Sequence, residues 1–446
     1  MGERLVVIGG DAGGMTAATQ ARRLDGDLDI VALEKGTWVS YSACGIPYLV
    51  AGDLERVQDL VARTPQEFRD NHRIDVRLRH EAMAIDTDAR QVEVRDHEHG
   101  RTVRIPYDQL VVATGASPYR PDVPGINGET VLGVQTLTDA QRLLDRNLRG
   151  MPRDVVVVGG GYIGLEMAET YVRLGAAVTI VDQAPEIMGT LDPDMAALVR
   201  TAMVRHGIEV RCGTAVTAFE PGAVHLADGA TLSADLVVLG TGVAPNSALA
   251  ADAGVETGVK GAIRVNRRQQ TDTEGIWAAG DCAESHHLVS GLPVHTPLGT
   301  VANRQARVAG INLGGGYATF PGVVGTAVTK LCATEVARTG LSEREAVAAG
   351  LEYVVGKIKA TTRAGYLPEA RPIVVKMLAE RGTGRILGAQ LVGEEGAGKR
   401  IDAVAVALTA GFTVEDLLNT DLAYAPPFSP LWDPVQVAAR KALAGL

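Results

Sequence analysis

The sequence has few cysteines, no long apolar run and no signal-peptide pattern. Its four cysteines are widely spaced, without the CxxC spacing of a structural zinc site or the density of a disulfide framework. We therefore expect free thiols, no metal site and a reducing compartment, and we interpret the chain as cytoplasmic. Met1 to Arg4 leads directly into an apolar strand pattern, and no stretch of about 18 apolar residues follows, so we expect no membrane span.

Positive charge is also in deficit. The chain has 43 basic and 53 acidic residues, a net charge of -10, which disfavours nucleic acid as a partner because phosphate binding needs clustered Lys and Arg. A content of 46% hydrophobic and 22% charged residues is that of an ordinary folded chain. At 446 residues it is too long for one hydrophobic core, so we expect several domains.

Two segments repeat one plan: an apolar strand, a glycine-rich turn and an amphipathic helical pattern. They begin at Arg4 and at Asp154. In the second, Gly159, Gly161 and Gly164 complete the GxGxxG pattern, which permits a tight turn, close approach of a pyrophosphate and packing of helix on strand. One such turn alone is often only a strand-to-helix connection. Two of them predict two nucleotide-binding units.

Each turn is followed by a second strand that ends in an acidic residue, Glu34 in the first unit and Asp182 in the second. A carboxylate at this place can accept hydrogen bonds from ribose hydroxyls. Asp11 stands where the second glycine of the first turn would be, so we expect its side chain to point away from the phosphates and to cap the following helix. Two dinucleotides in one chain favour hydride transfer from a nicotinamide to a flavin.

Further motifs give the chain a family resemblance. It rests on the first turn, SYSACGIPY from Ser40, LVVATGASPYRPDVPG from Leu110, the second turn, GTGVAPN from Gly240 and GIWAAGDCAE from Gly275. With these motifs the whole chain resembles the flavin-dependent pyridine nucleotide disulfide oxidoreductases. Within that family it resembles the single-cysteine branch of coenzyme A disulfide reductases, NADH oxidases and NADH peroxidases.

The resemblance implies an α/β fold with two Rossmann-like nucleotide-binding domains, for FAD and NADH, and an α+β interface domain that pairs two subunits. The implied domains are a first part of the FAD domain (1–117), the NAD(P)H domain (118–245), a second part of the FAD domain (246–320) and the interface domain (321–446). A homodimer is implied.

The resemblance also assigns cofactor contacts. Glu34 and Lys35 are expected at the adenosine ribose of FAD, Ala82 at its adenine and Asp281 at its ribityl chain, while Glu166 lies near the nicotinamide. The expected cofactor-binding residues are Gly9, Ala12, Gly13, Gly14, Glu34, Lys35, Ala82, Thr114, Gly115, Gly159, Gly161, Tyr162, Ile163, Gly164, Glu166, Asp182, Gly242, Gly280 and Asp281. Asp182 would repel a 2'-phosphate, and Gln183 and Ala184 offer no cation, so we expect NADH to be preferred, with NADPH possible.

Cys44 is the expected redox centre. Two-cysteine relatives carry CxxxxC, and the second position here is Leu49, so a local redox disulfide is excluded. A single thiolate beside a reduced flavin can accept electrons as a mixed disulfide or as a sulfenic acid. We expect Gly45 to leave the sulfur accessible and a following helix to lower the thiol pKa. The alternative is an inert buried cysteine, to which we assign Cys212, Cys282 and Cys332.

The first turn contains no histidine, which peroxide-cleaving relatives carry there, and this favours disulfide reduction over peroxide reduction. Arg22 and Arg23 match the place where coenzyme A disulfide reductases offer cations to coenzyme A, although two arginines also suit a solvated helix face. Ser40 is expected to support the substrate or its own loop. Ala43 replaces the Asn common in those enzymes.

By the same resemblance, Tyr366 and Tyr424 reach a neighbouring subunit's Cys44, where each phenol could serve a departing thiolate; packing at an interface is the alternative. The expected function is an FAD-dependent NAD(P)H:disulfide oxidoreductase acting on coenzyme A disulfide, or on a persulfide or polysulfide. An NADH oxidase reducing O₂ and a ferredoxin-type electron-transfer reductase are the alternatives.

Overall fold

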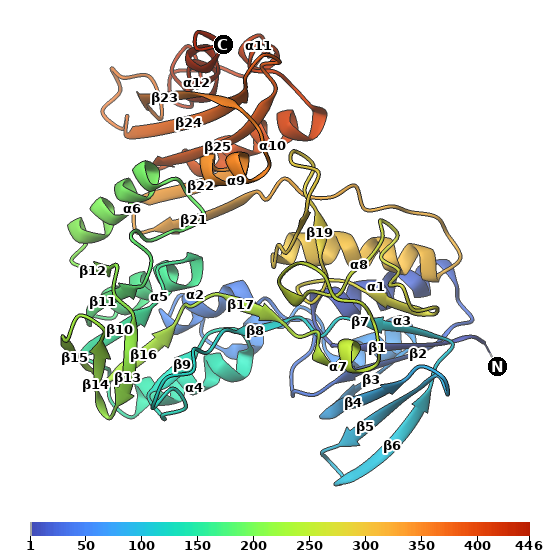
Figure 1. Ribbon diagram of the computed structural model, residues 1–446. Coiled ribbons are helices and arrows are strands. Elements are labelled where there is room, and N and C mark those ends of the chain that lie inside the picture. The colour runs from blue at the N-terminus through green and yellow to red at the C-terminus, as the bar shows by residue number, and fades with distance from the viewer. Residues whose placement is uncertain (1) are drawn as a thin grey trace.

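A computed structural model describes residues 2–446. Figure 1 shows two α/β units side by side and an α+β unit above them that contains the carboxyl terminus. This is the predicted fold class. The first unit combines the amino-terminal chain with a later segment that includes β18 and α8, whereas the second unit lies between them in sequence. The proposed domain boundaries stay a prediction.

The first unit is built on a five-stranded parallel sheet, and its neighbour in sequence is an antiparallel three-stranded meander. In spatial order the parallel strands are β18 (Ile276–Ala278), β7 (Gln109–Val112), β1 (Arg4–Ile8), β2 (Asp29–Glu34) and β3 (Ile74–Leu78). The meander is β4 (His80–Asp86), β5 (Gln91–Asp96) and β6 (Arg101–Pro106). The helices are α1 (Ala12–Leu24), α2 (Ile46–Val50), α3 (Pro65–His72), α7 (Ala248–Asp252) and α8 (Gly299–Leu313).

The second unit repeats this architecture. Its parallel sheet runs β12 (Glu209–Cys212), β11 (Ala177–Asp182), β10 (Asp154–Val158), β16 (Leu236–Leu239) and β9 (Val131–Gly133). The meander is β13 (Val216–Glu220), β14 (Gly222–Leu226) and β15 (Thr231–Ala234), and the helices are α4 (Leu137–Leu148), α5 (Tyr162–Arg173) and α6 (Pro193–Arg205). Two antiparallel strands, β8 (Ala116–Pro118) and β17 (Val243–Pro245), join the units.

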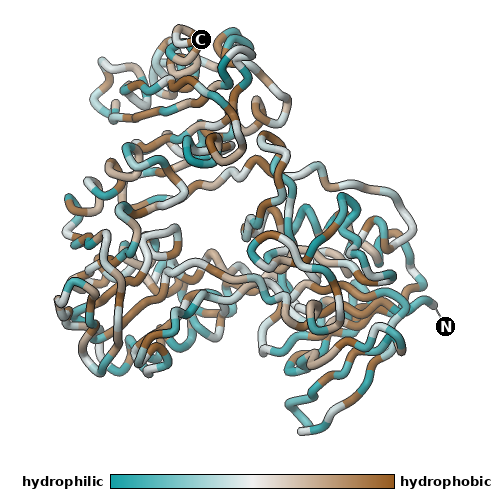
Figure 2. The backbone as a smooth tube through the Cα atoms, in the orientation of Figure 1, coloured by the Kyte–Doolittle hydropathy of each residue, from teal (hydrophilic) through white to brown (hydrophobic). Residues whose placement is uncertain are grey.

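The central strands are apolar along their whole length because both faces of each sheet are covered. In β1, Leu5 and Val7 belong to one buried cluster, and Val6 and Ile8 to another on the opposite face. The same alternation occurs in β10, where Val155 and Val157 lie in one cluster and Val156 and Val158 in another. Figure 2 shows these strands as hydrophobic bands inside each unit. Both sheets are therefore sandwiched between layers.

The third unit is an antiparallel five-stranded sheet with helices packed on it. The order is β21 (Ala327–Leu331), β22 (Thr334–Gly340), β25 (Ile386–Gly393), β24 (Pro372–Glu380) and β23 (Tyr353–Thr361). The helices are α9 (Glu343–Ala348), α10 (Ile401–Ala410), α11 (Val414–Leu418) and α12 (Pro434–Leu443), and a short hairpin, β19 (Ser285–His286) with β20 (Pro293–Val294), precedes the unit. No helix in residues 2–446 is long and apolar enough to cross a membrane.

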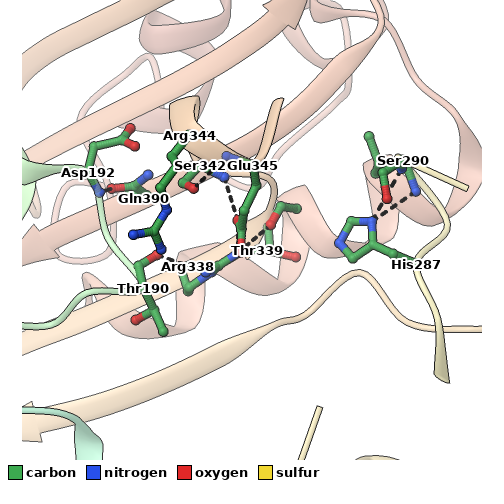
Figure 3. Close-up of polar contacts among 12 residues, drawn as sticks. Thr190, Asp192, His287, Ser290, Arg338, Thr339, Ser342, Arg344, Glu345 and Gln390 are labelled. Atoms are coloured by element: carbon green, nitrogen blue, oxygen red, sulfur yellow. Dashed lines mark hydrogen bonds and ion pairs between the residues drawn. The ribbon is translucent and has the colours of Figure 1, made fainter. Parts of the chain in front are cut away.

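Polar side chains fix the third unit to the second, as Figure 3 shows. Arg338 of β22 donates a hydrogen bond to the Thr190 carbonyl (2.8 Å) and another to Glu345 (2.9 Å). Gln390 of β25 accepts one from the Asp192 amide (2.8 Å). Arg338 and Gln390 are buried, so these bonds are shielded from water. Where the third unit meets the second, β21 lies directly beside α5.

Candidate active site

The first glycine turn is shaped by close backbone packing. Gly9 has φ +112°, and a side chain there would overlap the Ala113 carbonyl. A side chain on Gly14 would overlap the Gly9 carbonyl, which lets α1 lie against the turn. Glu34, at the end of β2, accepts the Gly10 amide at 2.9 Å. The turn and the acidic strand end therefore form one unit.

The second turn has the same geometry. Gly159 has φ +99°, and a side chain on Gly164 would overlap the Gly159 carbonyl. Asp182 accepts the amides of Gly160 and Ala184, each at 2.8 Å. Tyr162 and Ile163 begin α5 and are half-buried. The sequence repeat is thus a structural repeat.

The two helices that follow these turns have open amino ends. Elsewhere, α3 and α4 begin with capping boxes built by Thr64 and Thr136. By contrast, α1 and α5 have no side-chain cap and no acidic residue in the first turn. Their first amides have no intrahelical acceptor, and the helix dipole adds positive charge. Both ends can therefore bind an anion.

The prediction that Asp11 caps α1 is wrong. Its Oδ1 accepts the Tyr41 amide at 3.0 Å, so the carboxylate points to the Cys44 loop. Burial is the main cause that raises the Asp11 pKa to about 6, and Glu34 and Asp281 add to it. The Asp11 side chain therefore links the first glycine turn to the Cys44 loop, and it does not cap the amino end of α1.

The predicted closing segments of the first unit meet beside its glycine turn. Thr114 donates to the Asn246 carbonyl (2.5 Å), and Asn246 donates back to the Thr114 carbonyl (2.9 Å). The Gly280 amide donates to buried Gln305 (3.0 Å), and burial raises the Asp281 pKa to about 6. Asn246 and Gln305 were not among the predicted site residues, because nothing in their local sequence identifies these distant partners.

The remaining predicted cofactor contacts are placed as follows. Gly115 and Gly242 have positive φ, +68° and +85°, and each lies directly before one of the two connecting strands, β8 and β17. Lys35 is exposed, and Ala82 lies at a bulge in β4. Ala12 and Gly13 occupy the first turn of α1, and Gly161 is the residue before α5.

Cys44 lies in a short 3-10 turn, Ala43–Gly45, just before α2, and its side chain is exposed. Ser40 has φ 49°, and its backbone bonds the Gly10 carbonyl and the Ala62 amide. Gly45 packs so closely on Leu60 that a side chain there would overlap it. Ser40 therefore supports its own loop, and the loop holds the thiol at the surface.

The expected lowering of the Cys44 pKa is wrong for the described chain. Partial burial, which removes water from the thiol, is the main cause that raises this pKa. The carboxylates of Glu166, Asp281 and Asp11 raise it further. The helix after Cys44 has only five residues. Partial burial, together with three nearby acids, therefore outweighs a short helix dipole.

Glu166 brings the second unit into this neighbourhood. The helix α5 packs on α2, and Thr170 donates to the Pro47 carbonyl (3.1 Å). Glu166 is half-buried and accepts a hydrogen bond from Thr329 of β21 (2.9 Å). Burial raises the Glu166 pKa, whereas this bond lowers it. Sequence reasoning missed Thr329, since strand alternation predicts a buried position but not the partner.

The two tyrosines lie together and away from the glycine turns. Tyr366 is 74% exposed and Tyr424 47% exposed. Slight desolvation of the exposed phenol raises the Tyr366 pKa, and the neighbouring Tyr424 phenol raises it further. The pair is thus available at the surface of the third unit.

The two arginines of α1 differ. The Arg22 guanidinium donates to the carbonyls of Gly26 (2.7 Å), Leu28 (2.5 Å) and His72 (3.0 Å), so it holds the chain after α1. Its donors are directed to backbone carbonyls, and the expected contact of Arg22 with a ligand stays a prediction. Arg23 is exposed and makes no ion pair in the described chain.

The other cysteines match their predicted class in part. Cys282 is fully buried, whereas Cys212 and Cys332 are half-buried, and all four thiols are free. Residues 2–446 contain no cluster of three or more His, Cys, Asp or Glu side chains that could hold a metal ion. Among the four cysteines, Cys44 is therefore the exposed one.

A thiol between two nucleotide-type turns is the arrangement of an oxidoreductase that moves electrons between nucleotides and sulfur. Residues 3–306 match the pyridine nucleotide-disulphide oxidoreductase model, and residues 326–434 match the dimerisation domain of the same family. The chain belongs to this family of enzymes, as its sequence resemblance indicated. Membership implies FAD and NAD(P)H as cofactors.

Named relatives align over nearly the whole chain. A CoA-dependent NAD(P)H sulfur oxidoreductase of Pyrococcus furiosus is 38% identical, with 98% of each chain covered. An NADH oxidase of Methanocaldococcus jannaschii is 35% identical over 99% of each. A coenzyme A disulfide reductase of Staphylococcus epidermidis is 30% identical, covering 98% of this chain and 99% of the relative.

Solved structures agree with these relatives. The chain is 39% identical to an NAD-dependent persulfide reductase from A. fulgidus, with a TM-score of 0.95, covering 99% of this chain and 83% of that one. It is 34% identical to reduced Bacillus anthracis CoADR-RHD, with a TM-score of 0.96 and coverage of 99% and 80%. Both similarities include all three units.

Proposed function

We propose that this enzyme uses NADH to reduce a small-molecule disulfide, coenzyme A disulfide or a related persulfide, through FAD and Cys44. One observation carries the proposal: the exposed Cys44 thiol lies in a loop that Asp11 ties to the first glycine turn, and α2, which follows it, packs on α5 of the second unit. The names of the relatives support this substrate class.

The residues present fit two dinucleotides. The uncapped amino ends of α1 and α5 offer amide donors to two pyrophosphates. Glu34 and Asp182 are placed at the strand ends where ribose hydroxyls bind. In this proposal the first unit holds FAD and the second NADH. Bound FAD would supply hydride acceptance from the nicotinamide and two electrons for sulfur.

The chain's own part in the chemistry is thiol exchange at Cys44. Its thiolate attacks one sulfur of the disulfide, forming a new S–S bond and releasing the other half, which takes up a proton. Two electrons and one proton then return the Cys44 thiolate and free the second thiol. Leu49 in place of a second cysteine excludes a local resolving disulfide.

Arg23 is our candidate for the phosphates of coenzyme A, since Arg22 bonds backbone carbonyls. The paired phenols of Tyr366 and Tyr424 are candidate proton donors to the released thiol of a neighbouring subunit. This role requires a homodimer, which the dimerisation-domain match supports. Sedimentation of the purified enzyme tests that state directly.

NADH is the proposed reductant. Both oxygens of Asp182 bond backbone amides, which fixes its charge where a 2'-phosphate would lie. The values of kcat/KM for NADH and NADPH test this preference. Equal values would contradict it.

Replacing Cys44 by serine tests the proposed function. We expect NADH-dependent release of thiol from coenzyme A disulfide to fall by about 10³-fold or more, because the nucleophile is lost. Reduction of an artificial dye by NADH should persist, since both nucleotide sites remain. Cys332→Ser, which alters another free and half-buried cysteine, is the matched control. Turnover that survives in C44S would overturn the thiol mechanism.

A second candidate is an NADH oxidase, favoured by the 35% identical relative of that name. Oxygen consumption with NADH, compared with thiol release under the same conditions, separates the two. Mass spectrometry of the purified protein supplies independent evidence. A coenzyme A adduct on Cys44 would support disulfide reduction, whereas two or three added oxygens would favour peroxide chemistry.

A further inference from the structure

Thr329 makes a hydrogen bond between the third unit and the proposed active site. It lies in the middle of β21, is 5% exposed, and donates from Oγ1 to Glu166 Oε1 at 2.9 Å. Glu166 belongs to α5, in the first turns after the second glycine motif. The contact therefore joins a strand of the dimerisation domain to a helix of the proposed NADH unit.

Packing on both sides fixes this bond. Thr329 pairs with Val336 of β22, and the next inward residue, Leu331, lies in the same buried cluster as Leu165 and Met167 of α5. Threonine is β-branched, so its side chain has few rotamers. The hydroxyl is thus held in place from its own strand and from the helix that it faces.

The surroundings of Glu166 offer no cation to replace this bond. Three ionisable groups interact electrostatically with the Glu166 carboxylate: Cys44, Tyr48 and Glu169. All of them are neutral or acidic. No other side chain in the described chain donates a hydrogen bond to the Glu166 carboxylate. The Thr329 hydroxyl is thus the side-chain donor that this carboxylate has within residues 2–446.

We infer that Thr329 is a positioning residue that holds the Glu166 carboxylate in the orientation that serves the nicotinamide site. This inference rests on the proposed function for the place of NADH. Without the hydroxyl, a half-buried carboxylate loses its donor and holds a proton to higher pH. Hydride transfer should then slow, because a carboxylate that helps to position the nicotinamide is misplaced.

Two substitutions separate the hydroxyl from the shape of the side chain. Thr329→Val keeps the volume and removes the donor, whereas Thr329→Ser keeps the donor. Thr339→Val is the matched control: Thr339 is buried in the neighbouring strand β22 and shares a 2.7 Å hydroxyl bond with Thr326, away from Glu166. Retained FAD absorbance and an unchanged circular dichroism spectrum establish that each variant folds.

The first measurement needs no turnover. In protein labelled with ¹³C at glutamate carboxyls, the resonance lost in Glu166→Gln identifies Glu166, and its shift is followed against pH. We expect its titration midpoint to rise in T329V and to stay near the wild-type value in T329S and T339V. An unchanged midpoint in T329V would overturn the inference.

The second measurement is the single-turnover rate of flavin reduction by NADH. We expect a fall of about tenfold in T329V, of less than about twofold in T329S, and no change in T339V. Equal loss in T329S and T329V would show a packing role and overturn the inference. If the wild-type flavin is not reduced by NADH, the proposed function fails, while the carboxyl titration still decides the part of Thr329.

Discussion

His287 is a buried histidine whose protonation should weaken the fold. Its Nδ1 accepts the amides of Val289 (3.3 Å) and Ser290 (3.4 Å), which only an unprotonated nitrogen can do. Burial is the main cause that lowers the His287 pKa to about 4 from its ordinary 6.5. The folded chain therefore resists a proton that the unfolded chain accepts between these two values.

Acidification should therefore destabilise the folded chain through His287. The unfolded state binds more protons between about pH 6.5 and 4, so stability falls as pH decreases through this window. The full effect of this group is on the order of 3 kcal/mol. His287→Asn, which retains an acceptor near Nδ1, should lose less stability on acidification. Urea unfolding at pH 7, 5.5 and 4.5 measures the difference.

His206→Asn is the control for this prediction, because His206 is exposed at the end of α6. It should follow the wild-type pH dependence. Parallel curves for wild type and H287N would contradict the assignment to His287.

At this scale, local sequence predicted the residues whose role is set by nearby backbone. Glu34 and Asp182 follow their strands as expected. Hydrogen-bond partners that come from distant segments were not predicted. Asp11 bonds Tyr41 instead of its helix, and Arg22 bonds carbonyls beyond α1. A motif fixes where a side chain lies along its element. Its hydrogen-bond partner depends on distant loops that fold against that element.

At the scale of elements, the approach of α5 to β10 depends on Gly164. A Cβ there would overlap the Gly159 carbonyl and lie 3.4 Å from Val157 Cγ1, so Gly164→Ala must shift the helix or the turn. We expect a loss of about 1–3 kcal/mol in the free energy of unfolding, together with weaker NADH binding. Urea unfolding and titration with NADH measure the two effects.

Gly189→Ala is the matched control, since nothing lies near an added Cβ at that position. It should leave both quantities nearly unchanged. If G164A binds NADH as the wild type does, the packing at this turn does not position the nucleotide as proposed.

The parallel strands and their glycine turns were predictable because each signal is local: an apolar run, a turn and an acidic residue. The pairing of β18 with β7 joins residues more than a hundred positions apart, and no periodicity reports it. For that split sheet, and for the antiparallel third unit, only the family resemblance gave an expectation. The packing of β21 against α5, which brings Thr329 to Glu166, was not predicted.

At the scale of the whole molecule, a buried lysine joins the second and third units. Lys376 of β24 is 3% exposed, and its ammonium lies 3.0 Å from Asp192, 2.8 Å from Asp194 and 2.8 Å from Glu343. Asp192 is 2% exposed and precedes α6 of the second unit. These carboxylates raise the Lys376 pKa, in spite of burial that lowers it.

Lys376→Met should therefore destabilise the enzyme strongly. Methionine fills similar space, but it leaves Asp192 buried without its cation, and breaking a buried pair in this way costs about 3–5 kcal/mol.

Lys357→Met is the control: Lys357 pairs with Asp194 at 2.6 Å but is 35% exposed, so its loss should cost at most about 1 kcal/mol. Urea unfolding at pH 7 compares them. Because Asp192 and Lys376 lie in different units, K376M should also expose the chain just before α6, which contains Thr190 and Asp192, to limited proteolysis before global unfolding. Equal unfolding midpoints for the two variants would mean that apolar packing and the Arg338 bonds, rather than the buried charge, hold these units together.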